Sequence, residues 1–158
     1  MTISRESRRL AGILLVIIPT VVFGGASILR LLIGVESYTD NPMRQGLWGA
    51  GHAHAGVLLM LALVMLLYVD QATLSRPWLL VARYGVPLGA ILVPAAFFLS
   101  VIPADATSPN GLINLAWVGA VSVAAGVLAL GIGLLRAPAA VSDPSPAQMP
   151  TPVGTRST

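Results

Sequence analysis

Two histidines are the residues in this sequence whose side chains could most clearly do chemistry. His52 and His54 are the only histidines, and both lie in the apolar stretch "GHAHAGVLLM" at residues 51–60. An imidazole can bind a metal or haem iron, and it can change its charge near neutral pH. Cysteine is absent, which excludes disulfides, thiolate metal sites and cysteine nucleophiles. Without a phosphate-binding loop, paired carboxylates or a nucleophile–base pair, the chain is not expected to be an enzyme on its own.

The spacing of the two histidines indicates separate roles. Residues two apart in an α-helix point about 200° away from each other, so His52 and His54 are not expected to chelate one metal. His52 is predicted to share a small-residue face with Gly49, Ala53 and Gly56, inside the protein. His54 is predicted to face another helix or another subunit.

Three interpretations of the histidines remain open. Each ring could form only a structural hydrogen bond to a carbonyl or to water, both could ligate haem or copper, or they could act in a proton-linked or ligand-linked switch. Both lie roughly 8 to 11 Å inside the expected outer edge of their helix. Arg30 is expected at a similar depth, where it could pair with a haem propionate or extend to the membrane surface.

The segment "HAHAGVLLML" resembles the transmembrane helix of haem–copper oxidase and nitric oxide reductase catalytic subunits that carries a His-x-His pair. In that family the two histidines bind two haems on opposite sides of one helix. The resemblance implies that His52 and His54 are axial ligands of separate centres, with haem b or copper as the cofactor. This chain has no third histidine, so a second ligand would come from another subunit or from Met43, Met60 or Met65. The whole chain looks like small bacterial four-helix membrane proteins, a likeness that implies no activity.

The composition predicts the scaffold that positions these residues. Hydrophobic residues make up 56% of the 158 residues and charged residues only 9%, against about 25% charged in a soluble domain. Four apolar runs, at about 10–34, 47–69, 78–102 and 112–135, are each long enough to cross a bilayer as a helix. The predicted fold is an all-α membrane protein, an antiparallel four-transmembrane-helix bundle spanning residues 1–136.

The distribution of arginine predicts the orientation. Seven of the nine arginines fall on one side of a four-helix topology, and the other side has only Arg44 in its loops. The positive-inside rule then places both termini in the cytoplasm of a multi-pass cell-membrane protein. The arginines do not cluster on a polar face, so a nucleic-acid partner is not expected. The long first run makes a cleavable signal peptide the less favoured reading of the N-terminus.

Small residues and prolines predict how the helices pack. Glycines at 119, 126 and 133 form a smooth stripe, which indicates close approach to another helix within the chain rather than a dimer interface. Pro19, Pro87 and Pro94 lie inside helices and should loosen them locally. Residues 137–158 are rich in Pro, Ser, Thr and Ala, which predicts a disordered cytoplasmic tail.

Three functions follow from these patterns. The first is a haem-binding or copper-binding membrane subunit, with His52, His54 and Arg30 at the site, that acts in electron transfer or as a respiratory accessory subunit. The second is a non-catalytic scaffold or assembly protein whose histidines are structurally hydrogen-bonded. The third, a transporter or channel subunit, is least favoured because no helix carries a run of inward polar residues. The expected partners are the lipid bilayer and a homo-oligomer or larger membrane complex.

Overall fold

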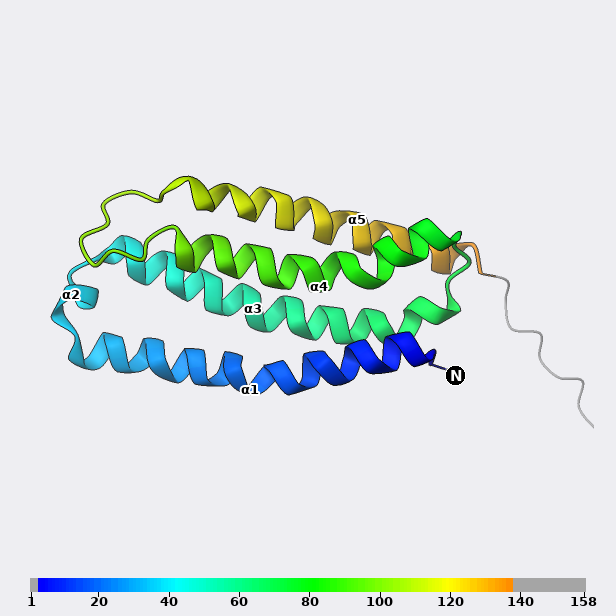
Figure 1. Cartoon of the computed structure of the whole chain (residues 1–158), viewed down its shortest axis with the longest axis horizontal. Helices are drawn as coiled ribbons and strands as arrows, with labels where there is room; N and C mark the ends of the chain where they lie inside the picture. The colour runs from blue at the N-terminus through cyan, green and yellow to red at the C-terminus, as the bar shows by residue number, and fades with distance from the viewer. Residues whose placement is uncertain (1–2, 138–158) are drawn as a thin grey trace, which may run out of the picture.

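Four long helices make up most of the protein. The computed structural model describes residues 3–137, and within that range every regular element is helical. Figure 1 shows consecutive long helices running in opposite directions along a common axis. The elements are α1 (Arg5–Gly34), α2 (Glu36–Thr39), α3 (Pro42–Tyr68), the 3₁₀ turn η1 (Val69–Gln71), α4 (Arg76–Leu99), the 3₁₀ turn η2 (Gly111–Asn114) and α5 (Leu115–Leu135).

Each of the four long helices is long and apolar enough to cross a membrane. This confirms the all-helical class and gives four candidate spans, the number predicted. The length and composition of these helices are those of a multi-pass membrane protein. Apart from Ala137, the predicted tail lies outside the described residues.

Local capping explains why two helices begin earlier than the apolar pattern predicts. The side chain of Ser4 accepts a hydrogen bond from the amide of Ser7, so α1 begins at Arg5 rather than near residue 10. Asn41 caps α3 in the same way through the amide of Arg44, and Pro42 occupies the first turn. Polar first turns thus extend both helices beyond their apolar stretches.

Long-range hydrogen bonds define the two ends of the protein. At the first end, the amide of Ser4 donates to Asp70 and the amide of Thr73 donates to the carbonyl of Gly133. At the second end, the side-chain amide of Asn41 donates to the carbonyl of Ala104. The first end therefore holds the start of α1, the α3–α4 connection and the end of α5. The second holds the α1–α3 and α4–α5 connections.

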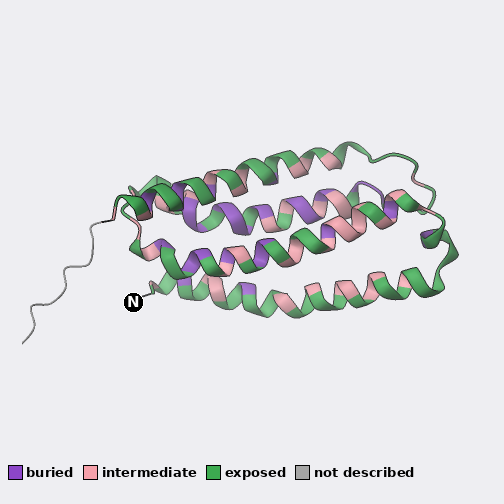
Figure 2. Cartoon of the chain, turned by 180° about the vertical axis from the view of Figure 1, so that it is seen from behind, coloured by how far each residue is buried: buried purple, intermediate pink, exposed green. Residues whose placement is uncertain are grey.

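The helices pack mainly in chain order. α4 makes its most extensive contacts with α5 and then with α3, whereas α1 packs chiefly on α3. Only Ser7 and Leu14 of α1 are buried, and Figure 2 shows that most of this helix is exposed or half-buried. α1 is therefore an edge helix attached to a unit made of α3, α4 and α5.

The buried core lies toward the first end. It combines residues from all four long helices, including Leu14 of α1, Leu66 of α3, Val86 of α4 and Leu130 of α5. The histidine segment lies in the other half of α3, where His52 is half-buried and His54 is exposed. The helices thus pack most tightly away from the two histidines.

The glycine stripe of α5 packs directly against α4 and the connection before it. Gly119, Gly126 and Gly133 are all buried, and a Cβ added to Gly126 would lie 3.2 Å from Cα of Gly85 in α4. This confirms the prediction that the stripe serves packing within the chain. The prediction that Gly49 and Gly56 form a closely packed small-residue face on α3 is wrong. A Cβ added at either position would meet nothing within 4 Å among the described residues.

Gly51 is instead the close-packed glycine of α3. It is buried, and a Cβ there would lie 3.1 Å from the ring of Phe98 and 3.2 Å from Cβ of Phe97 in α4. Gly51 precedes His52 by one residue, so α4 packs against α3 directly beside the histidine segment.

The prolines do not interrupt the helices: α1 continues through Pro19, and α4 continues through two buried prolines, Pro87 and Pro94.

Candidate functional site

The two histidines contact different helices, as their spacing predicts. The ring of His52 lies against α1, where a Cβ added to Gly25 would be 2.7 Å from its Nε2 atom. The ring of His54 lies against Phe97 of α4, edge to face, with 5.4 Å between ring centroids. The segment therefore forms two separate environments on opposite sides of α3.

The ring of His52 packs against the glycine backbone of α1. Gly24 and Gly25 of α1 are its neighbours, and any side chain at Gly25 would collide with the ring. The Nε2 atom faces the backbone of α1, so a haem iron could reach it only if α1 moved away. His52 therefore fits a packing role between α1 and α3 better than a ligand role in this arrangement.

His54 lines an apolar groove between α3 and α5, with α4 as its floor. The groove has a volume of about 660 Å³, within the roughly 300–1,000 Å³ of typical small-molecule sites. Small residues at one-turn spacing on α5, Ala116, Ala120 and Ala124, leave the space open, and Trp117 lies at its edge. Among residues 3–137, His54 is the only ionisable side chain in the lining.

A hydrogen bond orients the His54 ring. Its Nδ1 atom lies 2.8 Å from the carbonyl oxygen of Ala50, one turn earlier in α3. A carbonyl oxygen can only accept, so Nδ1 is the donor, and in the tautomer with one ring proton the lone pair lies on Nε2. A histidine that binds a metal usually donates its other ring nitrogen in this way. His54 is thus prepared to accept a bond at Nε2.

Arg30 does not join either histidine. It is exposed near the end of α1, beside a shallow hollow of about 320 Å³ whose lining comes from α1 alone. The neighbours of His52 are Gly24 and Gly25, and the His54 groove is lined by α3, α4, α5 and the turn η2. Within residues 3–137 no group of three or more metal-binding side chains comes together.

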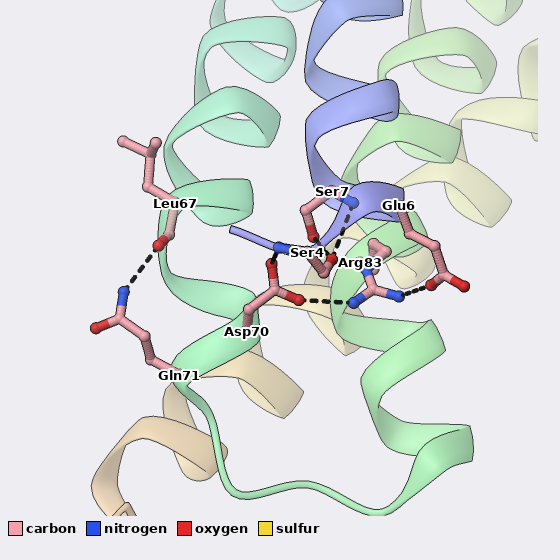
Figure 3. A network of polar contacts seen from close by, with 7 residues as sticks. All are labelled: Ser4, Glu6, Ser7, Leu67, Asp70, Gln71 and Arg83. Carbon is pink, nitrogen blue, oxygen red and sulfur yellow. Dashed lines mark hydrogen bonds and ion pairs between the residues drawn. The ribbon is translucent and has the colours of Figure 1, made fainter. Parts of the chain in front are cut away.

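A second polar centre, not expected from the sequence, lies at the first end. Arg83 of α4 is only 4% exposed, and it forms ion pairs with Glu6 of α1 and with Asp70, whose carboxylate lies 2.8 Å from Nη2. Figure 3 shows Asp70 between Arg83 and the start of α1, where it also accepts from the amide of Ser4 at 2.9 Å. This cluster, defined here as the Ser4–Glu6–Asp70–Arg83 clasp, ties α1 to the rest of the protein.

The sequence does contain a signal for this clasp. Arg83 follows Val81 and Ala82 well inside an apolar run, and a charged residue at such a depth requires a partner. The arginine count used to predict the orientation takes Arg83 as a residue at the membrane surface, and it therefore overlooks its burial. Its Nε atom has no hydrogen-bond partner among the described residues, so even the two carboxylates do not use all of its donors.

Arg44 is a buried arginine at the second end, as Arg83 is at the first. It is 8% exposed and donates through Nε to the carbonyl of Val101 at 3.1 Å and through Nη2 to that of Ile102 at 3.2 Å. Its guanidinium lies 4.5 Å from the ring centroid of Trp48 and 5.8 Å from that of Tyr38. Burial raises the pKa of Tyr38 above its ordinary value, although the positive charge of Arg44 opposes the effect. These contacts fasten the end of α4 to the start of α3.

Comparisons with known proteins add no family to this picture. No protein-family model matches the chain, and no curated protein or solved structure is significantly similar to it.

Proposed function

We propose that this protein is a haem-binding subunit of a membrane complex, and that His54 supplies the axial ligand in the groove between α3 and α5. The observation that carries the proposal is the combination of the Nδ1–Ala50 hydrogen bond with the position of His54 in the lining of an apolar groove. On this proposal the bound haem would supply one-electron transfer. The protein would act as an accessory subunit and not as an enzyme on its own.

The size and apolar lining of the groove suit a large, flat, apolar ligand. Most of its lining is aliphatic or aromatic, and Trp117 and Phe97 offer ring surfaces beside His54. The groove opens toward the surface that lipid would cover, so a lipid-soluble ligand could enter sideways from the bilayer. Haem b fits these features because its porphyrin is apolar and its iron takes an imidazole nitrogen.

Copper is less well supported than haem. A copper site normally needs several nitrogen or sulfur ligands, and the groove lining contains one histidine and no methionine. Met60 lines a different hollow, between α1 and α3. A second axial ligand for haem would come from another subunit or a second copy of this chain.

The absorption spectrum of the purified protein tests the proposal. Protein made in a haem-replete host and purified in detergent should show a Soret band. His54→Gly should abolish the band, and added imidazole should restore it by filling the vacated position. His52→Ala should retain the band, because His52 faces α1. A wild-type protein without Soret absorbance, or a His54→Gly variant that keeps it, would refute the proposal.

A non-catalytic scaffold or assembly protein is the second candidate. It is favoured by the finding that each histidine already has a structural neighbour, Gly25 for His52 and the Ala50 carbonyl for His54. On this reading His52→Ala would leave a gap between α1 and α3 and lower the thermal stability. Retention of a partner complex by His54→Gly, together with a wild type that lacks haem, would support this candidate.

We also propose that the helices cross the cell membrane as an antiparallel bundle with both termini in the cytoplasm. The support is the arginine distribution, with the arginine-rich first end inside. The His54 groove would then lie in the outer half of the bilayer.

A further inference from the structure

A second hollow lies at the first end, between the start of α4 and the last turns of α5. It has a volume of about 620 Å³ and is lined by Ser75 and Trp78 at the start of α4 and by Ala125, Leu128 and Arg136 of α5, among others. It is separate from the His54 groove, and no residue lines both. Its position at the helix ends places it where lipid headgroups meet the acyl region.

The two ends of this hollow differ in chemistry. Toward the helix termini it is lined by Thr73, Ser75 and Arg136, which carry hydroxyl groups and a positive charge. Toward the middle of α5 the lining is apolar, with Ala125 and Leu128. A ligand that fits both ends must have a polar head and a hydrocarbon chain.

The polar end carries the guanidinium of Arg136 and the hydroxyls of Thr73 and Ser75, which can donate. Three carbonyls in the last turn of α5 are already bonded: Ile132 accepts from Arg136, Gly133 from Thr73, and Leu134 from Ala137. The side chain of Ser75, the N-cap of α4, makes no capping hydrogen bond. Within residues 3–137 the ion pairs involve Arg83 only, so no carboxylate there neutralises Arg136. A head that complements this end is therefore anionic.

We propose that this hollow binds one anionic glycerophospholipid. Its phosphate lies between Arg136 and the start of α4, and one acyl chain follows the apolar face of α5 past Leu128 and Ala125. Arg136 supplies a charge-assisted hydrogen bond to the phosphate, and Trp78 packs on the glycerol region at the membrane interface. Basic hollows between membrane helices recognise anionic headgroups by the same chemistry.

Native mass spectrometry of the full chain in detergent tests the site. Phosphatidylglycerol and phosphatidylcholine with identical acyl chains are added at equal concentrations, and the one-lipid complexes are compared. Wild type should retain phosphatidylglycerol preferentially. Arg136→Gln should weaken this binding about tenfold, the size expected for loss of one charge-assisted contact. Arg9→Gln, which removes an exposed arginine of α1 at the same end, should change it little.

A second variant tests the chain-binding part. Ala125→Leu fills the apolar end without changing the charge, and it should also weaken phosphatidylglycerol binding. Circular dichroism establishes that each variant is folded. Equal retention of the two lipids by wild type, or equal losses in Arg136→Gln and Arg9→Gln, would overturn the proposal, because the attraction would then be diffuse and not local. These readouts do not depend on haem, so they stand apart from the test of His54.

Discussion

Replacement of Gly85 by alanine should separate the two most closely packed helices. A Cβ at this position would lie 2.7 Å from the carbonyl oxygen of Ser122 and 2.9 Å from Cα of Gly126, both in the backbone of α5. Ordinary carbon–carbon contacts are about 3.5–4.0 Å. Neither neighbour is the end of a flexible side chain, so α5 must move by several tenths of an ångström or more.

The magnitude follows from three contributions. Overpacking of a close contact costs about 1–3 kcal/mol. The shift also strains the hydrogen bond from the hydroxyl of Ser122 to the carbonyl of Gly85, 2.8 Å long, which contributes about 1 kcal/mol. Alanine stabilises a helix by about 1 kcal/mol relative to glycine, which offsets this last loss. The net destabilisation is about 1–3 kcal/mol, or a decrease in Tm of roughly 2–12 °C.

Thermal unfolding in detergent, followed by far-UV circular dichroism, measures the effect. Gly131→Ala is the matched control, since a Cβ there would meet nothing within 4 Å in the part of the chain that the structure describes, and its Tm should be unchanged or slightly higher. Gly126→Leu approaches the same contact from α5 and should be at least as damaging as Gly85→Ala. If Gly85→Ala melts at or above the Tm of Gly131→Ala, the two backbones do not touch as described.

Three further predictions concern the ends of the protein. Arg83→Met should lower stability by about 1–3 kcal/mol, because it leaves the half-buried carboxylate of Asp70 without its cation. Glu6→Gln should cost less, at most about 1 kcal/mol, because Glu6 is 67% exposed; equal losses in thermal unfolding would contradict this. Arg44→Met should speed hydrogen exchange in residues 100–106, which lose the two Arg44 hydrogen bonds and keep those of Asn41, and unchanged exchange would show that the Arg44 bonds are dispensable. Reporter fusions at residues 40, 73 and 107 and at the C-terminus should read outside, inside, outside and inside, and an external C-terminus would overturn the proposed topology.

Periodic and compositional features of the sequence predict the scaffold well. Four apolar runs become four long helices, because a span of that length leaves little alternative for the backbone. The heptad spacing of Gly119, Gly126 and Gly133 identifies the packed face of α5, since helix geometry alone places these residues in one line. The same geometry predicts that His52 and His54 contact different neighbours.

Features that depend on the rotation of one helix against another are not predictable in this way. The groove at His54 is lined by Ala116, Ala120 and Ala124 of α5 together with α3 and α4, and the sequence of α5 does not say which helix lies beside these alanines. The clasp joins Glu6 to Arg83, which are 77 residues apart. Gly49 and Gly56 are small residues without a close partner within residues 3–137, so smallness alone does not identify a contact.

The clasp has a consequence for how the chain is made. α1 leaves the ribosome before α4, yet the partner of Glu6 and Asp70 is Arg83, which lies in α4. Until α4 has been inserted, α1 can meet only α3, through contacts such as that of His52 with Gly25. During synthesis α1 can therefore dock on α3, but the clasp closes only after α4 has been inserted. Nascent chains that stop before Arg83 should leave the start of α1 more open to cross-linking by neighbouring proteins.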